Sequence, residues 1–327
     1  MPTMTVSSPR SGTTSPVTSI RKIHNSATPS SFESTADFTL AHATLGEGSS
    51  GTLYISRVEP PVASNHFAST TSQLFRYSPS KASIWSLHSP KLSPSSIVLA
   101  HSRGTTLLHD WDLGVVRTNV SPDGSDSLCC SSDPIGRTIV SGLRDGRVEV
   151  RDTRSPLNEQ SGGLAAWLET SVTSVHMLEC GDRILATTMS GQVGVFDVRR
   201  MAPSQRSASL ERAFHARKRP RGAKGPVQVI AFQVAPSENG TNPVRCDVDE
   251  VNGVIAVVSP TRNLEVFSLS SGSLLASRRF AGISDVPSQA QDENDVRPVV
   301  RLWGNCGVVG GGVVTGWEEA FEIWGCS

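Results

Sequence analysis

Two aspartate–arginine pairs with the same spacing are the residues of this chain best suited to bind a partner. Asp152 and Arg154 close the segment SGLRDGRVEVRDTR, and Asp197 and Arg199 close the similar segment ATTMSGQVGVFDVR. Residues two apart on a β-strand share a face, so each aspartate is expected beside its arginine. Arginine offers a planar fork of donors and a stem that packs on apolar surface. The pairs therefore suit a protein-binding surface, or alternatively an internal contact in which each arginine caps its aspartate.

The other reactive side chains form no pattern typical of an enzyme. The eight histidines have no metal-ligand spacing to another His or Cys, and the chain contains no Gly-x-Ser-x-Gly elbow. His101 and His109 are interpreted as structural histidines. Cys129 and Cys130 are adjacent on a predicted strand and should face opposite sides of a sheet. We expect no catalytic residue, no metal and no cofactor.

A basic run, RAFHARKRPRGAKG at residues 212–225, is the second candidate site. Its charges include Arg217, Lys218, Arg219 and Arg221. The run resembles a nuclear-localisation signal, and a solvated loop is the alternative interpretation. Nucleic-acid binding is disfavoured because only Phe214 is available to stack on a base.

Global properties restrict the partners and the location of the protein. The net charge is zero, which gives no general attraction to nucleic acid or to a membrane surface. No apolar run has the length of a membrane span, and the first residues have no apolar signal-peptide core. Six cysteines without a Cys-x-x-Cys pair indicate reduced thiols in an intracellular protein. We expect a nuclear or cytoplasmic location, or both.

The two Asp-x-Arg segments are copies of a longer repeat. Each copy reads as two short apolar strands, a turn, and a third strand that ends at one of six aligned positions: Arg57, Asp110, Asp152, Asp197, Ser268 and Gly325. The predicted leading strands are residues 83–89, 96–102, 127–133, 137–143, 171–177, 183–189, 227–233 and 253–259. A small sheet cannot bury both of its faces alone, whereas sheets repeated around an axis cover one another. The repeat therefore predicts an all-β propeller with core residues Leu92, Val98, Ile139, Val140, Ile184, Leu185, Ile255 and Val257.

The strings DGRVEVRDTR, SGQVGVFDVR and GTTLLHDWD resemble the third strand of WD repeats, which closes on a Trp-Asp pair. Arg151 and Phe196 stand at the Trp position, and the Gly-His pair of many WD repeats is missing. The resemblance covers roughly residues 38–327 and implies a WD-repeat-like β-propeller, with six recognisable repeats and the seven blades usual in the family. We assign the propeller to residues 17–327. A disordered Ser/Thr/Pro-rich tail, residues 1–16, is expected before it, with a basic loop at 212–225 and an acidic loop at 284–297.

Two consecutive repeats that end in Asp-x-Arg are similar to the double WDxR feature of WD-repeat substrate receptors of cullin–RING ubiquitin ligases. In that family the arginines contact the adaptor that links the receptor to the cullin. The resemblance implies a non-catalytic scaffold whose Arg154 and Arg199, with Asp152 and Asp197, bind such an adaptor. The opposite face, with the turns around Asp145, Ser190 and Arg262 and the basic loop 212–225, would then be free for the substrate protein.

Two other functions remain open from the sequence. One is a general WD-repeat scaffold of a nuclear RNA-processing or chromatin complex, for which the basic run is the relevant feature. The other is an enzyme with a site at the mouth of the propeller channel, which no motif supports. For the scaffold functions the expected partners are proteins, and the chain is expected to be a monomer within a larger complex.

Overall fold

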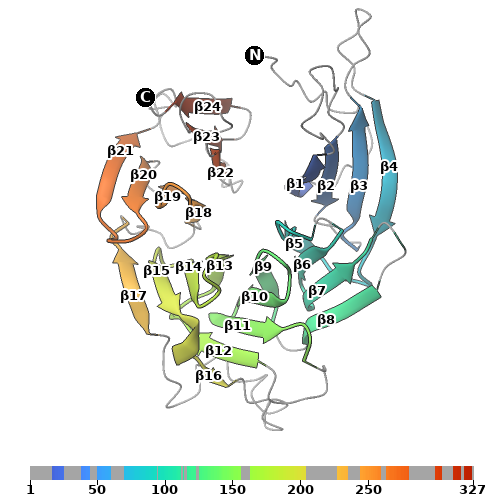
Figure 1. Cartoon of the computed structure of the whole chain (residues 1–327), viewed down its shortest axis with the longest axis horizontal. Helices are drawn as coiled ribbons and strands as arrows, with labels where there is room; N and C mark the ends of the chain where they lie inside the picture. The colour runs from blue at the N-terminus through green and yellow to red at the C-terminus, as the bar shows by residue number, and fades with distance from the viewer. Residues whose placement is uncertain are drawn as a thin grey trace, which may run out of the picture. The chain divides into compact units, whose positions relative to one another are not determined.

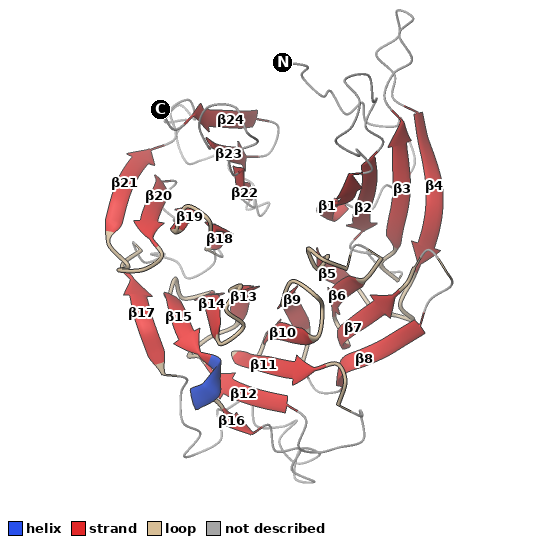
Figure 2. Ribbon diagram, viewed as in Figure 1, coloured by secondary structure: helices blue, strands red, loops and turns tan. Residues whose placement is uncertain are grey.

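The computed structural model describes residues 17–25, 38–44, 50–59, 70–93, 95–111, 113, 116–122, 125–155, 163–203, 227–234, 244–258, 263–279, 299–303, 312–317 and 320–325, and all structural statements below concern these residues. The chain forms two compact units, Met1–Ile84 and Trp85–Ser327. Nearly all described elements are β-strands, with one short 3₁₀ turn, η1 (Val198–Arg200) (Figure 2). The fold is therefore all-β, as the sequence predicts.

Strands that follow one another in the chain pair antiparallel into six sheets, A to F (Figure 1). Sheet A consists of β1 (Val17–Asn25), β2 (Phe38–Thr44), β3 (Leu53–Glu59) and β4 (Thr70–Tyr77). Sheet B consists of β5 (Ile84–His88), β6 (Ile97–His101), β7 (Gly104–His109) and β8 (Val116–Pro122). Sheet C consists of β9 (Ser127–Ser132), β10 (Thr138–Leu143), β11 (Arg147–Asp152) and β12 (Gly163–Trp167), with the short β16 (Ala202–Pro203) added to the edge of β12.

The remaining sheets repeat the same up-and-down order. Sheet D consists of β13 (Val172–Met177), β14 (Arg183–Thr188), β15 (Val193–Asp197) and β17 (Gln228–Phe232). Sheet E consists of β18 (Arg245–Asp249), β19 (Val254–Val258), β20 (Asn263–Ser268) and β21 (Leu274–Arg279). Sheet F consists of β22 (Val299–Trp303), β23 (Gly312–Trp317) and β24 (Ala320–Gly325).

Most predicted leading strands are confirmed, but the role of residues 227–233 was wrong. We expected this segment to open a new repeat. Instead β17 pairs with β15 as the fourth strand of sheet D, with Val195 opposite Ile230. The next repeat opens with β18, a strand the sequence analysis missed. Fourth and first strands are both short and apolar, so their pattern alone does not distinguish them.

Glycines with positive φ shape the turn before the third strand in three sheets. Gly104, Gly146 and Gly191 have φ values of 115°, 89° and 89°. At Gly146 a Cβ atom would lie 2.9 Å from the Leu168 carbonyl oxygen and 3.0 Å from that of Thr170. Only glycine meets both the conformational and the steric requirement without strain. The glycine of the repeat is therefore set by the backbone path.

Neighbouring sheets share apolar cores, because consecutive residues on one strand face opposite sides. On β9, Cys129 belongs to the core between sheets C and D, whereas Cys130 belongs to the core between sheets B and C. On β14, Ile184 faces the C–D core and Leu185 faces the D–E core. The opposite orientation predicted for the two cysteines is confirmed.

Seven of the eight predicted core residues are buried, and Leu92 is not. Val98, Ile139, Val140, Ile184, Leu185, Ile255 and Val257 are all 0% exposed. Leu92 is 72% exposed because it lies in the turn between β5 and β6, outside both strands. The prediction of Leu92 as a core residue was wrong because it considered only the apolar side chain and not the prolines and serines of the surrounding turn.

One backbone hydrogen bond recurs at the same place in four sheets. The first or second residue after the third strand donates its N–H to a carbonyl in or beside the turn between the first two strands. The bonds are Trp111 to Ser95 (3.1 Å), Thr153 to Arg137 (2.7 Å), Val198 to Asp182 (2.9 Å) and Leu269 to Gly253 (2.8 Å). These bonds define one end of sheets B to E, which we call the Asp–Arg end.

Several predicted segments lie outside the described residues. They are the tail 1–16, the basic loop 212–225 with Arg217, Lys218, Arg219 and Arg221, and the acidic loop 284–297. Among the residues that the structure describes, no helix is long and apolar enough to cross a membrane.

Candidate functional site

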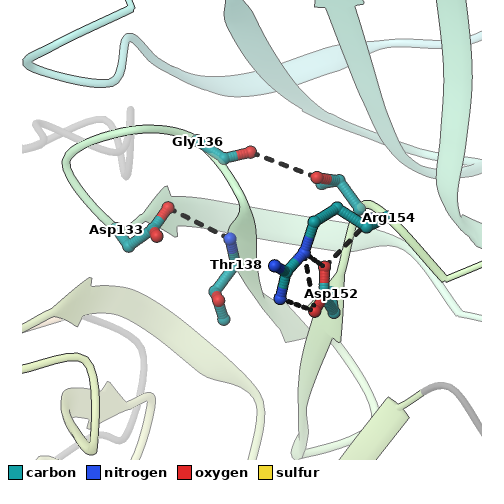
Figure 3. A network of polar contacts seen from close by, with 6 residues as sticks. Asp133, Gly136, Thr138, Asp152 and Arg154 are labelled. Atoms are coloured by element: carbon teal, nitrogen blue, oxygen red, sulfur yellow. Dashed lines mark hydrogen bonds and ion pairs between the residues drawn. The ribbon is translucent and has the colours of Figure 1, made fainter.

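The first Asp-x-Arg pair forms a compact turn at the end of β11 (Figure 3). Asp152 Oδ1 accepts hydrogen bonds from the backbone N–H of Arg154 and from its Nε, each at 2.9 Å. The Nη2 group of Arg154 donates to Asp152 Oδ2. The N–H of Ser155 donates to the Asp152 carbonyl oxygen at 3.2 Å and closes the turn. One carboxylate thus holds both the backbone and the guanidinium of Arg154.

The second pair repeats this geometry at the end of β15. Asp197 Oδ1 accepts from the backbone N–H and the Nε of Arg199, and Oδ2 accepts from Nη2, all at 3.0 Å. Among the described residues, two further contacts are made by the second pair and not by the first. Arg199 Nη1 lies 3.3 Å from Asp182 Oδ2, and Arg200 Nε lies 3.8 Å from Asp197 Oδ2.

The contact within each pair is confirmed, but its geometric cause differs from the prediction. We expected aspartate and arginine to share one face of a continuing strand. The strands end at Asp152 and Asp197, and the arginines lie beyond them. An aspartate that accepts the N–H two residues later forms a local turn, which brings the two side chains together. The arginine therefore does cap its aspartate, as the alternative interpretation required.

Capping does not bury the arginines. The side chains of Arg154 and Arg199 are 67% and 65% exposed. The outward edge of each guanidinium therefore remains accessible to a partner, while its position is fixed by the carboxylate behind it.

The arginines also control the ionisation of their aspartates. The hydrogen bonds from the Arg154 side chain, and then from its backbone N–H, lower the pKa of Asp152 to about 2. The Arg199 side chain lowers the pKa of Asp197 in the same way. In return, each aspartate raises the pKa of its arginine. Both pairs consequently stay fully ionised at neutral pH.

Each turn is attached to the turn between the first two strands of its own sheet. Besides its N–H bond to Arg137, Thr153 donates from Oγ1 to the Gly136 carbonyl oxygen at 3.4 Å. Asp133 stabilises that neighbouring turn by accepting the Thr138 N–H at 3.0 Å (Figure 3). Arg154 and Arg199 therefore occupy equivalent positions in sheets C and D.

Exposed apolar residues at the same end were missed as site residues by the sequence analysis. Four of them stand in turns of the Asp–Arg end: Leu92, Leu113, Ile135 and Val251. The Leu92 N–H donates to the Pro134 carbonyl at 2.7 Å, which links the turn of Leu92 to the turn of Ile135. The turn of Ile135 is itself hydrogen-bonded to the first arginine turn through Thr153. Their signal in the sequence is an aliphatic residue inside a polar turn.

The residues at the Trp position of the repeat have different environments. Phe196 is 2% exposed and fills the core between sheets C and D. Arg151 belongs to a row of charges on β11, with its Nε 4.0 Å from Glu149 Oε2. Arg147 Nη1 lies 3.0 Å from Glu149 Oε1, and its guanidinium carbon lies 5.6 Å from the centre of the Trp167 ring.

The opposite end of sheets C and D carries the turns assigned to substrate binding. Asp145 accepts the Arg147 N–H at 3.1 Å, and burial raises the pKa of its carboxyl. The Ser190 N–H donates to Thr170 Oγ1 at 3.1 Å. Arg262, the third residue of that assignment, lies outside the described residues. The two described turns are held by local hydrogen bonds.

Two of the histidines, His101 and His176, have structural contacts. His101 Nε2 lies 2.9 Å from Thr106 Oγ1, and its Nδ1 accepts the Arg103 N–H at 3.1 Å. Burial lowers the pKa of His101 to about 4, with a smaller effect from Arg103. His176 Nε2 lies 3.3 Å from Glu250 Oε1 and links sheets D and E. Among the described side chains, no group of His, Cys, Asp and Glu is arranged to hold a metal ion.

Neither a search of protein-family models nor a search of curated proteins found a match.

Proposed function

We propose that the sheets of this chain form a WD-repeat-like β-propeller. Sheets B to E each contain an up-and-down run of four strands, and successive sheets pack through their first two strands: β6 on β9, β10 on β13, β13 on β18 and β18 on β22. The recurrent hydrogen bond at the Asp–Arg end occurs once in each of these four sheets. Radial repetition is the arrangement in which such sheets cover each other. The seven-blade number rests on the resemblance to WD repeats.

On this fold the chain acts as a non-catalytic protein-interaction scaffold whose Asp–Arg end docks a protein partner. The observation that carries this proposal is the equivalent placement of Arg154 and Arg199 in adjacent sheets, each held by an aspartate and each about two-thirds exposed. A side chain that is already held loses less conformational freedom on binding. Arginine is also enriched among the residues that dominate protein–protein affinity.

The exposed apolar turn residues support a protein as the partner. Leu92 and Ile135 are exposed, and the turn of Ile135 is hydrogen-bonded both to the turn of Leu92 and to the first arginine turn. Apolar side chains flanked by arginine are typical of the centre of a protein–protein interface. A nucleic-acid backbone would favour a surface of excess positive charge, whereas Arg154 and Arg199 are each paired with a carboxylate.

The most specific form of the proposal is a substrate receptor of a cullin–RING ubiquitin ligase. It rests on the similarity of the consecutive Asp-x-Arg ends to the double WDxR feature of those receptors. Arg154 and Arg199 would contact the adaptor that bridges receptor and cullin. The opposite end, with Asp145 and Ser190, would remain open for a substrate protein.

The test is a binding measurement between the purified full chain and the purified adaptor subunit. We expect Arg154→Ala combined with Arg199→Ala to weaken binding by about 30-fold or more, as for interface residues worth about 2 kcal/mol. Arg144→Ala is the matched control: this exposed arginine is also paired with an aspartate, Asp126 at 3.0 Å, but lies in a turn at the opposite end. It should leave adaptor binding unchanged.

The fold must be intact in all variants for this comparison. Exposed ion pairs contribute about 0–1 kcal/mol each, so the variants should melt within a few degrees of the wild type. Equal adaptor binding by the double variant and the wild type would contradict the docking role of the arginines. A chain that binds no adaptor at all would favour the general nuclear scaffold over the ligase receptor.

A further inference from the structure

Ser155 stands where a modification would act directly on the first arginine turn. It follows Arg154 immediately, and its N–H bond to the Asp152 carbonyl is the last hydrogen bond of the turn. The residue is partly exposed. Its hydroxyl makes no hydrogen bond to another residue that the structure describes. Within the described part of the chain, modification of Ser155 would break no hydrogen bond of its hydroxyl.

The sequence around Ser155 supplies a recognition element for one class of enzyme. The next residue is Pro156, so the segment reads Thr-Arg-Ser-Pro. Proline-directed protein kinases select a serine or threonine followed by proline. In the reaction the Ser155 hydroxyl oxygen bonds to the γ-phosphorus of ATP, and the bond from that phosphorus to the β–γ bridging oxygen breaks. ADP leaves, and the hydroxyl proton passes to a base of the kinase.

Two exposed arginines lie in this turn or next to it, and the charges of both act on Asp152. Arg154 is the neighbouring residue, with its guanidinium mostly in solvent. Arg137 is exposed, and its carbonyl oxygen accepts the Thr153 N–H. A phosphoserine carries a charge of about −1.5 to −2 and three strong acceptor oxygens at neutral pH. It would compete with the single carboxylate of Asp152 for the donors of Arg154.

The second arginine turn has no serine at the position of Ser155. The residue that corresponds to Ser155 there is Arg200, whose Nε lies 3.8 Å from Asp197 Oδ2. Asp182 gives Arg199 a further acidic neighbour. A phosphate is therefore possible at only one of the two turns, and the other turn is a natural internal control.

We propose that Ser155 is a site of proline-directed phosphorylation, and that its phosphate engages Arg154 and Arg137 and so withdraws Arg154 from a docked partner. The consequence for docking rests on the proposed function, whereas the modification and the phosphate–arginine contact stand without it.

The first test is phosphorylation of the purified full chain by a proline-directed kinase with ATP, followed by mass-spectrometric mapping. We expect phosphate on Ser155 in the wild type and its absence in Ser155→Ala. Ser8-Pro9 and Ser15-Pro16 in the same chain report that the kinase is active. Phosphate on those serines without any on Ser155 would overturn the proposal.

The second test asks whether the phosphate contacts the arginines. The second ionisation of phosphoserine, normally near pH 6, is followed by ³¹P NMR. We expect its midpoint to rise by several tenths of a pH unit when Arg154 and Arg137 are both changed to alanine, since neighbouring cations favour the dianion. The control is Arg144→Ala, which should leave the midpoint in place. Equal midpoints in all three proteins would overturn the contact.

The third test measures adaptor binding by the phosphorylated chain. Phosphorylation should weaken binding at least as much as Arg154→Ala alone, and the Ser155→Ala chain treated with kinase should bind as before treatment. Unchanged binding after modification would overturn the regulatory role. If the unmodified chain does not bind the adaptor, the proposed function fails, while the mapping and the NMR titration still decide on the site itself.

Discussion

Each aspartate of the two turns interacts with the arginine two residues later through both backbone and side chain. This makes the carboxylates of Asp152 and Asp197 the acceptors around which the turns are organised. The pair explains why the Asp-x-Arg spacing recurs: the spacing is the one at which a side chain can bond the backbone of its own turn. Binding by the arginine and capping of the aspartate are thus two properties of one geometry.

A pH-dependent stability follows from these contacts. The pKa of both carboxyls is lower in the folded chain than in an unfolded aspartate, so the unfolded chain takes up protons more readily. The stabilisation is therefore complete above a pH of about 5 and is lost as the pH falls toward about 2. We expect the combined variant Asp152→Asn and Asp197→Asn to be less stable than the wild type at pH 6, with a difference that shrinks at pH 3.

Urea denaturation of both proteins across this pH range measures the effect. The difference between the two unfolding midpoints is the quantity to follow, because other titrating groups contribute equally to both chains. A difference that stays constant from pH 6 to pH 3 would show that the carboxylates are not ionised partners of the arginines.

At the scale of the strand and turn, glycine placement decides whether a hairpin can form. Gly146 and Gly181 both have positive φ, 89° and 72°, and both donate their N–H within a tight turn. They differ in space: a Cβ on Gly146 would meet two carbonyl oxygens within about 3 Å, whereas a Cβ on Gly181 would meet nothing within 4 Å.

Alanine substitutions at Gly146 and Gly181 separate two contributions to the loss of stability: the unfavourable backbone conformation and the steric crowding of the added Cβ atom. Gly181→Ala should destabilise the chain by about 1–2 kcal/mol, the usual cost of a left-handed alanine. Gly146→Ala should cost more, because the Leu168 and Thr170 carbonyls must also move. Thermal or urea unfolding of the two variants compares them. A smaller loss for Gly146→Ala than for Gly181→Ala would contradict the close approach seen here.

The repeat in the sequence predicts the strands well and their partners less well. The Gly-to-Asp segments of sheets C and D correspond to β11 and β15, which end at Asp152 and Asp197. Segment 227–233 was misplaced because a fourth strand and a first strand have the same apolar pattern, and only pairing with β15 distinguishes them. For the same reason β18 was missed.

The sequence predicted the residues of the candidate site but not the turn geometry that brings them together. Asp152, Arg154, Asp197 and Arg199 were identified from spacing, and their contacts exist. The turn that produces the contacts depends on where each strand ends, which the alternation of apolar residues does not define. Leu92 and Ile135 were not predicted as site residues, because exposure is a property of the folded surface. An aliphatic residue in the sequence suggests a core position, as was predicted for Leu92.

At the scale of the second unit, shared cores couple the sheets. Residues of sheets C and D contribute to one apolar cluster, and residues of sheets D and E to another. The backbone also connects sheets C and D. After η1, at the end of sheet D, the chain continues into β16, which pairs with β12 at the edge of sheet C. No single sheet among these can unfold without exposing the core face of its neighbour.

We therefore expect cooperative loss of structure across these sheets. Amide hydrogen exchange at increasing urea should show β10, β14 and β19 losing protection at the same concentration. Val140→Ala, a truncation in the C–D core, should lower that concentration for all three strands together. Loss of protection in β10 alone would mean that the sheets are independent modules.

The two adjacent thiols of β9 have a practical consequence. Cys129 Sγ lies 3.7 Å from the Val172 carbonyl oxygen of sheet D, whereas Cys130 Sγ lies 3.5 Å from the Val98 carbonyl oxygen of sheet B. An alkylating reagent can reach either sulfur only after the corresponding seam between sheets has parted. The alkylation rates of Cys129 and Cys130 therefore report the opening of the C–D and the B–C contact separately, and the faster rate identifies the contact that opens more readily.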